Sequence, residues 1–377
     1  MKTYHVGILG FGMIGKVHAY GYLNLPLFYE PPPLAAKITH IVTSRQETAE
    51  KAARMVGAET AATDYREVTE NPAVDIVHVC TPNHLHKDAL LSALWHQKHI
   101  YCDKPLTATM TEAQEIQAAL PYYRGTAQMT FQNRFFPAIM RAKQLVEEGR
   151  LGEVLEFRAA YLHGGSADPR APLKWKLSAA AGGGVIADLA SHVFDLIDHL
   201  IGPFGSIMAS TKIAWPQRPV AGDSSQMATV DTEDCVMLLA RMKSSALGTI
   251  EATKLASGAE DELRVEIHGT RGALRFNLMD PHHLDFHDAT APDRPQGGLR
   301  GWNRIDAGQR YPAPASNFPT PKAATGWLRG HQACLANFLQ AVAEGRPAEP
   351  GLEQGIRVQQ IMECVRRSAA EGRWIDI

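Results

Sequence analysis

The hydrophobic pattern of the first 125 residues alternates between two kinds of segment. Short runs with nearly every position apolar predict strands buried on both faces, and each is followed by a segment with helical spacing of apolar residues. The strand-like runs are HVGILG, KITHIVT, VDIVHVCTP and KHIYC. The helix-like segments are IGKVHAYGYLN, QETAEKAARMVG, HKDALLSALWHQ and TATMTEAQEIQAAL, the last with Thr109 or Thr111 as its N-cap. Strands that alternate with helices in this way predict a doubly wound parallel sheet.

The period of the pattern changes to two after the helical segment PAIMRAKQLVEEGRLG. Alternating apolar positions predict strands in EVLEFRAAYLH, GSIMASTKIAW, DCVMLLARMKSSALGTIEATKL and ELRVEIHGTRGALRFN, and turns such as GTRG favour an open antiparallel sheet. Residues 280–326, rich in Pro, His, Gly and Asp, predict long loops, and two helical segments end the chain. The predicted class is α/β: a Rossmann-type doubly wound parallel sheet domain at 1–125 and an α+β domain with a large open, mainly antiparallel sheet at 126–377.

Composition narrows the classes of partner. The chain has 377 residues, a net charge of −2 and no basic stripe, so neither nucleic acid nor a membrane surface is an expected partner. Its five cysteines are scattered without a CxxC pair, which excludes a disulfide framework or a zinc finger and fits a reducing compartment. The N-terminal segment has no signal-peptide pattern, and no apolar stretch is long enough to span a membrane. We therefore expect a cytoplasmic protein with a small-molecule partner.

A glycine loop follows the first predicted strand. Gly10, Gly12 and Gly15 have G-x-G-x-x-G spacing between a strand and a helix. The first glycine permits a tight turn, the second lets a pyrophosphate approach the backbone, and the third lets helix and strand pack closely. The alternative is a glycine-rich turn without a ligand. The motif predicts that a dinucleotide contacts the whole loop, namely Gly10, Phe11, Gly12, Met13, Ile14 and Gly15.

The end of the second strand bears on the choice of dinucleotide. NAD-binding domains usually carry an acidic residue there that binds the ribose hydroxyls, but this strand ends in Thr43, Ser44 and Arg45. The hydroxyl of Ser44 and the guanidinium of Arg45 suit a 2′-phosphate, so the sequence favours NADP slightly over NAD. The alternative is that Arg45 is an ordinary solvated loop residue.

Polar residues also follow the next two strands. Because ligands bind outside the carboxyl ends of parallel strands, these residues are expected at the cofactor. A surface ion pair is the alternative for Asp103 and Lys104. The later segment FQNRFFP could reach the nicotinamide through Gln132 and Asn133, or could be a hinge strand. The expected cofactor contacts after these strands are Thr81, Pro82, Asn83, His86, Asp103 and Lys104.

A polar stripe lies on the helix predicted at residues 182–202. Asp188, His192, Asp195 and His199 have spacings of 4, 3 and 4, beside a buried stripe that begins at Leu189. Asp188 and His192 lie near the glycine-rich start of this helix, where an Asp–His pair could orient an imidazole for proton transfer. The alternatives are a solvated polar face, or a metal site, for which a third ligand is missing.

The motifs GFGMIG, CTPNHLH, CDKPL and GGGVIADLASHVFD together resemble the glucose–fructose oxidoreductase / inositol dehydrogenase (GFO/IDH/MocA) family, as do the C-terminal segments VEIHGTRGALRF and EGRPAEPGLEQGIRVQQIMECVRRSAAEGRW. The resemblance covers nearly the whole chain. It implies a two-domain NAD(P)-dependent oxidoreductase that acts on sugars, cyclitols or their derivatives. In such an enzyme, residues 1–125 form the dinucleotide-binding domain and residues 126–377 the domain for substrate binding and oligomerisation. It further implies that Lys104, Asp188 and His192 meet at the substrate and that Asp103 contacts the nicotinamide-side ribose. The sequence departs from the family at Asp103, where the family has Glu, and at the second strand, which lacks the acidic residue.

These residues lead to a mechanistic hypothesis in which His192 removes a hydroxyl proton, Asp188 orients the imidazole and Lys104 stabilises the developing alkoxide. His163, Trp175 and Lys176 lie where the family has its variable substrate loop. Trp175 could stack on a sugar ring, or could be structural. Alternative functions are NAD-dependent glycoside cleavage and a non-catalytic dinucleotide-binding regulator. Apolar strands such as CVMLLARM predict burial of the open sheet face in a homodimer or homotetramer.

Overall fold

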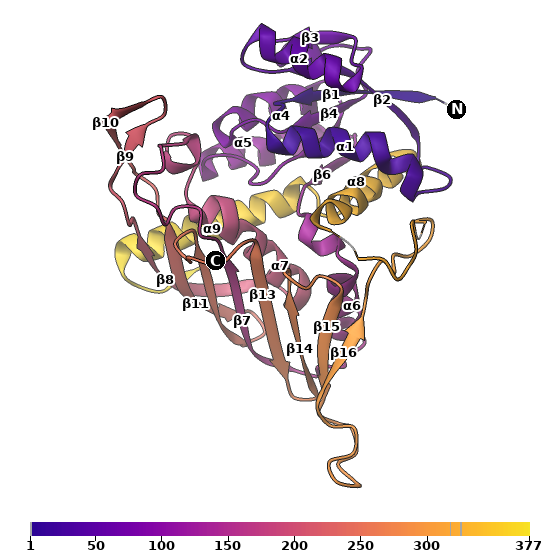
Figure 1. Ribbon diagram of the computed structural model, residues 1–377, viewed down its shortest axis with the longest axis vertical. Coiled ribbons are helices and arrows are strands. Elements are labelled where there is room, and N and C mark those ends of the chain that lie inside the picture. Colours follow the sequence, from indigo (N-terminus) through magenta and orange to yellow (C-terminus); the bar gives the residue numbers. More distant parts are fainter. Residues whose placement is uncertain (1, 317, 325) are drawn as a thin grey trace. The chain divides into compact units, whose positions relative to one another are not determined.

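The chain divides at Gln132 into two units, each with its own sheet (Figure 1). The computed structural model describes residues 2–316, 318–324 and 326–377. The first unit consists of the residues up to Gln132 together with Tyr311–Thr320 and Trp327–Gln359. The second unit consists of the remaining segments. The first unit therefore takes up C-terminal segments that lie beyond the division expected at residue 125. A buried hydrogen bond of 2.9 Å from the Gln128 side chain to the carbonyl of Cys334 is one of the contacts that hold them there.

The sheet of the first unit consists of six parallel strands in the order β3-β2-β1-β4-β5-β6. As the sequence predicts, the strands carry apolar residues on both faces, and every residue of the central β4 is buried. The chain order reverses between β1 and β4, which is where this kind of sheet binds ligands. The bounds are β1 Thr3–Leu9, β2 Ala35–Val42, β3 Thr60–Ala62, β4 Ile76–Val79, β5 His99–Cys102 and β6 Ala127–Met129.

Helices connect these strands. Helix α1 packs against α8, and α4 packs against α5. The predicted helix start at Thr109 is confirmed, because Thr109 and Glu112 form a capping box at the N-terminus of α5. The helices are α1 Met13–Phe28, α2 Gln46–Val56, α3 Arg66–Thr69, α4 His86–Trp95, α5 Met110–Ala119 and α8 Trp327–Glu344, together with α9 Leu352–Glu371, which passes into the second unit.

The sheet of the second unit has nine strands in the order β16-β15-β14-β13-β7-β12-β11-β8-β17. Its pairs are antiparallel except for the parallel pair of β7 and β12, so the predicted mainly antiparallel sheet is confirmed. A separate hairpin joins β9 and β10. The bounds are β7 Val154–Leu162, β8 Phe204–Lys212, β9 Gln217–Val220, β10 Asp223–Thr229, β11 Cys235–Met242, β12 Leu247–Thr253, β13 Glu262–Gly269, β14 Gly272–Asn277, β15 His283–Asp288, β16 Trp302–Asp306 and β17 Ile375–Asp376.

The prediction of loops at residues 280–326 is wrong for β15 and β16. These two strands are short and rich in polar residues, and they extend one edge of the sheet by pairing in sequence with β14. Only Leu284 and Phe286 of β15 and none of the residues of β16 are buried, so few apolar residues mark these strands in the sequence. These strands form because they pair with the sheet edge at β14, and the local sequence pattern alone does not predict them.

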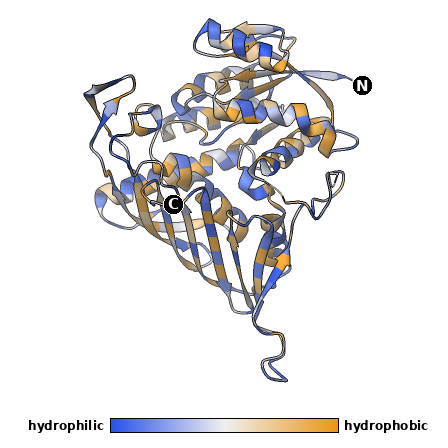
Figure 2. Ribbon diagram, in the orientation of Figure 1, coloured by the Kyte–Doolittle hydropathy of each residue, from blue (hydrophilic) through white to orange (hydrophobic). Residues whose placement is uncertain are grey.

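Helices cover one face of this sheet, whereas the other face stays open (Figure 1). Helix α6 (Pro137–Glu147) contacts β14 and β15, and α7 (Ser191–Ile201) contacts β7. Burial alternates strictly along β11, where Leu238 and Ala240 face the core and Met237 and Leu239 are exposed. The striping of hydrophobic and hydrophilic residues along these strands is visible in Figure 2. In the described part of the chain, no helix combines the length and apolarity that crossing a bilayer would need.

The capping box gives a test of helix assignment. Replacing Thr109 with Ala removes the acceptor for the amide of Glu112, so we expect the free energy of unfolding to fall by about 1 kcal/mol. Thr111 is exposed in the same turn and serves as the matched control, for which Thr111→Ala should change the free energy by less than about 0.5 kcal/mol. Urea denaturation followed by circular dichroism measures both. Equal effects of the two substitutions would contradict the assignment.

Candidate active site

The glycine loop of the first unit has the shape that a dinucleotide phosphate needs. Gly10 has a φ of +87°, and a Cβ there would lie 2.6 Å from the carbonyl oxygen of Cys80. A Cβ on Gly15 would lie 2.1 Å from the carbonyl oxygen of Gly10, whereas one on Gly12 would meet no described atom within 4 Å. The backbone is thus tightly packed at Gly10 and Gly15, whereas space remains beside Gly12. No side chain of the described residues caps the N-terminus of α1 at Gly12, so its amides can bind an anion.

The predicted loop contacts Phe11, Met13 and Ile14 belong to this same turn, and Met13 at the first position of α1 is 66% exposed. The amide of Gly10 donates to the carbonyl of Val42 (2.8 Å), which anchors the turn beside the end of β2. These observations fit a bound NAD(P), whose pyrophosphate would rest on the open backbone at Gly12.

The end of β2 carries the residues expected near the adenine ribose. Ser44 and Arg45 are exposed, and Arg45 is the N-cap of α2. The hydroxyl of Thr43 donates to the carbonyl of Arg45 (2.9 Å), and the hydroxyl of Thr48 donates to the same carbonyl (2.8 Å). The backbone is therefore fixed, while the Ser44 and Arg45 side chains stay accessible.

His86 links the polar segments that follow β4 and β5. Its imidazole is fully buried, with Nε2 at 2.8 Å from the carbonyl of Thr81 and Nδ1 at 3.1 Å from that of Pro105. Burial lowers the pKa of His86, although these carbonyls act in the opposite direction. Of the other predicted contacts in this segment, Asn83 is buried and Pro82 is half-buried. His86 therefore connects the loop after β4 to the loop after β5. Its place in the sequence motif does not reveal this structural role.

Asp103 and Lys104 stand at the carboxyl end of β5. The amide of Asp103 donates to the carbonyl of Val79 (2.9 Å), so the segment is anchored to β4. Both side chains are half-buried, and the Lys104–Pro105 peptide bond is cis. Lys104 is close enough to His331 for its charge to lower the pKa of that buried imidazole, in addition to the larger effect of burial.

In the second unit, three consecutive glycines bring two other segments against the start of a helix. A Cβ on Gly183 would lie 2.4 Å from the carbonyl oxygen of Lys176, and one on Gly184 would lie 2.3 Å from the Glu233 carboxylate. Glu233 accepts from the amide of Ile186 (3.0 Å), and the amide of Gly184 donates to the carbonyl of Lys176 (2.9 Å). Gly183 is therefore needed for close approach to the backbone of Lys176, and Gly184 for close approach to the Glu233 carboxylate.

Asp188 lies between two lysines. Its Oδ1 is 2.7 Å from Nζ of Lys176, and its Oδ2 is 2.9 Å from Nζ of Lys254. The Lys254 side chain is only 11% exposed and that of Asp188 only 18%. Residues 186–190 form a π-helical turn before α7 begins at Ser191, so the regular α-helical spacing predicted between Asp188 and His192 is interrupted.

His192 is buried and packs against Tyr161, with ring centroids 5.8 Å apart. The hydroxyl of Tyr161 donates to Asp261 (2.6 Å), and Nε2 of His163 lies 2.9 Å from the same oxygen. Burial, followed by the charges of Asp261 and Asp188, raises the pKa of Tyr161, so its phenol stays protonated. The structure thus places the predicted residues His163, Asp188 and His192 at one end of β7, linked through Tyr161 and Asp261.

The alternative of a solvated polar stripe is wrong for His192 and Asp195, which are both buried. Asp195 is held by Arg134, whose Nε donates to one carboxylate oxygen (2.8 Å) and whose second nitrogen donates to the other. Burial, with Arg134 and Lys143 nearby, lowers the pKa of His199 to about 3. Asp195 and His199 therefore contribute to the packing of α7.

Two further predicted residues lie where the units adjoin in sequence. Gln132 and Asn133 begin a short 3-10 helix, Gln132–Phe135, so the alternative of a hinge strand is wrong. Both are buried, and neither amide atom of Asn133 has a hydrogen-bond partner among the described residues. A buried amide with both atoms unsatisfied is consistent with a role in binding a ligand. The predicted Trp175 begins a second 3-10 helix, and its side chain is 40% exposed.

Lys254 is the site residue that sequence reasoning missed. It follows β12, which pairs in parallel with β7, so the carboxyl ends of both strands lie at the same edge and the amide of His163 donates to the carbonyl of Thr253 (2.9 Å). The signal available in the sequence was a lysine directly after an alternating strand, in EATKL. Recognising it required knowledge that these two strands are neighbours.

Comparison with known proteins agrees with this arrangement. Residues 4–131 match the model of an oxidoreductase family with an NAD-binding Rossmann fold, and residues 143–377 match the C-terminal alpha/beta domain of an oxidoreductase family. Levoglucosan dehydrogenase of Pseudarthrobacter phenanthrenivorans is 33% identical over 100% of this chain and 99% of its own length. Inositol 2-dehydrogenase of Rhizobium meliloti is 24% identical over 100% of this chain and 99% of its own length.

Solved structures show the same likeness. A structure titled levoglucosan dehydrogenase in complex with NADH and levoglucosan superimposes with a TM-score of 0.94 at 33% identity, covering 100% of this chain and 99% of that one. An oxidoreductase domain protein from Kribbella flavida gives a TM-score of 0.93 at 30% identity, covering 100% of both chains. With both halves of the chain matched and a full-length relative at 33% identity, the chain belongs to the GFO/IDH/MocA oxidoreductase family and is an NAD(P)-dependent dehydrogenase of its sugar and cyclitol class.

Proposed function

We propose that the chain oxidises a ring hydroxyl of a neutral sugar of the anhydrosugar type, with levoglucosan as the first candidate. The observation that carries the proposal is the Asp188 carboxylate held by Lys176 and Lys254 beside His192, with the partly exposed Trp175 on the same loop as Lys176. Sugar hydroxyls bind charged donors and acceptors, and the face of a ring can stack on an indole. The full-length relative named levoglucosan dehydrogenase supports the choice of sugar.

The cofactor would be held by the open backbone of the glycine loop, with Asp103 toward the nicotinamide-side ribose and with Thr81, Pro82, Asn83, Gln132 and Asn133 as further expected contacts. When bound, its nicotinamide ring supplies the acceptor for the hydride. Because Asp103 is one carbon shorter than the Glu of the family, its contact with the ribose is part of the proposal.

The chain's own groups would handle the proton and the oxygen. His192 accepts the hydroxyl proton of the substrate, and its contact with Tyr161 limits rotation of its ring. Lys104 stabilises the negative charge that develops on the substrate oxygen while the carbon loses hydride. Asp188 is proposed to orient His192 and to bind a substrate hydroxyl, and its ion pairs with Lys176 and Lys254 hold the carboxylate in place. His163, anchored on Asp261, would bind a further hydroxyl.

The proposal is tested by the increase in absorbance at 340 nm with levoglucosan, other anhydrosugars, inositols and common sugars. Lys104→Met should lower kcat by roughly 100-fold or more, because the oxygen loses its charge partner, while fluorescence titration still detects coenzyme binding. Lys87, a half-buried lysine on α4 that pairs with Asp88 and Glu115, is the control, and Lys87→Met should leave kcat unchanged.

Near-normal turnover of the Lys104→Met variant would overturn the assignment of Lys104. Release of an aglycone from a chromogenic glycoside, without net reduction of coenzyme, would instead establish glycoside cleavage. Coenzyme binding with no turnover of any compound in the panel would support a regulator.

Coenzyme choice follows from the end of β2. The exposed Ser44 and Arg45 suit a 2′-phosphate, and the absence of a carboxylate at residues 43–45 weakens binding of the free ribose hydroxyls. Against this preference, the similar levoglucosan dehydrogenase was solved with NADH. We propose that both coenzymes are accepted and that Arg45 is the residue that recognises NADP.

We therefore expect Arg45→Ala to raise the KM for NADP about tenfold and to leave the KM for NAD unchanged, because only NADP carries the phosphate that a guanidinium binds. Ser44→Asp should lower the KM for NAD. Arg54, a basic residue in the last turn of the same helix, is the control, and Arg54→Ala should affect neither value. An unchanged KM for NADP in the Arg45→Ala variant would contradict the assignment.

The open face of the nine-stranded sheet supports a homo-oligomer. Exposed apolar side chains such as Met237 and Leu239 lie there among charges of both signs, including Arg158 and Glu266, around a hollow of about 930 Å³. A second copy that faces this surface about a two-fold axis would bury the apolar side chains of both copies against one another.

Met237→Asp should convert the oligomer to a monomer, because a carboxylate would be buried against apolar side chains. Light scattering after size-exclusion chromatography measures the mass. Met55, which is similarly exposed on α2, is the control, and Met55→Asp should leave the mass unchanged. A wild-type monomer, or an unchanged mass for Met237→Asp, would refute this interface.

A further inference from the structure

The loop at residues 163–178, called here the substrate loop, carries Trp175 and Lys176 to Asp188. Its described secondary structure is limited to the 3-10 helix Trp175–Leu177, and its centre at residues 168–170 is exposed. A connection of this length does not keep one course unless other groups fix its backbone. The question is therefore what fixes the part of the loop that precedes Trp175.

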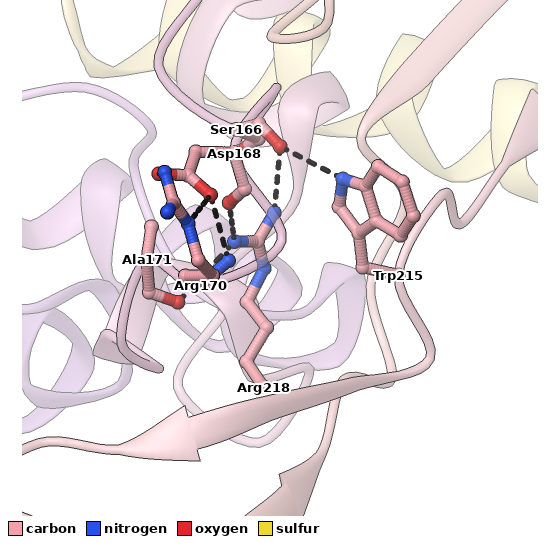
Figure 3. Close-up of polar contacts among 6 residues, drawn as sticks. All are labelled: Ser166, Asp168, Arg170, Ala171, Trp215 and Arg218. Carbon is pink, nitrogen blue, oxygen red and sulfur yellow. Dashed lines mark hydrogen bonds and ion pairs between the residues drawn. The ribbon is translucent and has the colours of Figure 1, made fainter. Parts of the chain in front are cut away.

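Arg218 on β9 reaches into the substrate loop (Figure 3). Its guanidinium donates from Nη2 to the carbonyl of Ser166 (2.7 Å), and from Nη1 to the carbonyls of Asp168 (2.8 Å) and Ala171 (3.3 Å). The residue is only 1% exposed, although it lies on a small two-stranded hairpin. One buried side chain thus gathers three backbone carbonyls from six residues of the loop.

Only an arginine can make this set of bonds from one position. Its planar fork presents several donors in fixed directions, whereas a lysine offers a single ammonium. The carbonyl of Ser166 also accepts from Nε1 of Trp215 (3.1 Å), as Figure 3 shows. A buried guanidinium with carbonyl partners is costly to lose, because removing it leaves those carbonyls without their donor.

The same hairpin also fixes the second half of the substrate loop. The amide of Leu173 donates to the carbonyl of Pro219 (2.7 Å), the residue after Arg218. Three residues later, the carbonyl of Lys176 accepts from Gly184, and Nζ of Lys176 pairs with Asp188. The substrate loop is therefore held at its start by Arg218, in its middle by the backbone of Pro219, and at its end by contacts with the candidate site.

We propose that Arg218 is a positioning residue that fixes the course of the substrate loop and thereby places Trp175 and Lys176 against the sugar. The proposal rests on the proposed sugar oxidation for the identity of the ligand. The role of Arg218 in holding the loop stands on the contacts of the second unit alone.

Two measurements on Arg218→Met test it. The KM for the sugar should rise about tenfold or more, with kcat within about threefold of wild type and the KM for coenzyme unchanged, because Lys104 and His192 lie outside the substrate loop. Limited digestion with trypsin, followed by mass spectrometry, should show faster cleavage after Lys174 and Lys176. Arg218→Lys should recover part of both properties, since an ammonium can bind one of the carbonyls.

Arg170 provides a matched control in the same loop. It is also drawn in Figure 3, but its side chain is 87% exposed and pairs with the neighbouring Asp168 carboxylate. Arg170→Met should change neither the sugar KM nor cleavage after Lys174. Trp215→Phe, which removes one bond to Ser166, should shift both properties in the direction of Arg218→Met but by less, and it remains informative if Arg218→Met fails to fold.

The outcomes separate this proposal from the proposed function. If wild type oxidises a sugar and Arg218→Met keeps the same KM and the same resistance to trypsin, the role of Arg218 is refuted and the function stands. If wild type oxidises no sugar in the panel, the proposed function fails, and the trypsin measurement still decides whether Arg218 holds the loop. A rise in KM with no faster cleavage would refute positioning of the loop as its cause.

Discussion

The carboxylate of Asp188 lies between two ammonium groups, and the arrangement of the second unit's site depends on this balance of charge. A carboxylate removed from water is costly unless partners surround it, so both lysines must reach the same π-helical turn. Lys254 comes from the end of a strand, whereas Lys176 comes from a long loop. The loop can approach because Gly183 and Gly184 leave room for the carbonyl of Lys176 and the carboxylate of Glu233. The glycine-rich stretch therefore lets Lys176 approach Asp188, in addition to preceding the helix.

The need to pair charged groups away from water has different consequences for Arg134 and Arg218, two arginines of this unit. Arg134 binds the carboxylate of Asp195 and so joins the residues that precede α6 to α7, two elements of regular structure. Arg218 binds carbonyl oxygens instead, and these belong to a segment that has little regular structure of its own. Pairing with a side chain fixes one rotamer, whereas pairing with several carbonyls of one segment fixes the course of the backbone. A loop can in this way become as well defined as a helix without a helical hydrogen-bond pattern.

Features that depend on residues close in sequence could be predicted, and those that depend on distant partners could not. Apolar runs predicted the parallel strands, and the spacing of Gly10, Gly12 and Gly15 predicted the tight turn between β1 and α1, because each signal lies within one segment. The strands β15 and β16 escaped prediction because an existing sheet edge stabilises them. The contribution of Lys254 depends on the parallel pairing of β7 with β12, which no local pattern encodes. The π-helical turn at Asp188 also broke the regular spacing that the sequence implied.

The groups proposed to react and the groups proposed to recognise the sugar are held in place by different kinds of contact. The groups proposed to move the proton and stabilise the oxygen, His192 and Lys104, lie in short motifs at the ends of regular elements, where the fold itself fixes them. The groups proposed to face the rest of the sugar lie on a loop whose course depends on Arg218 and on backbone contacts with the β9 hairpin. A change in the loop or the hairpin can therefore alter which sugar fits without disturbing the reacting groups. Such a separation explains how one fold can hold a fixed dehydrogenase chemistry while its substrates differ.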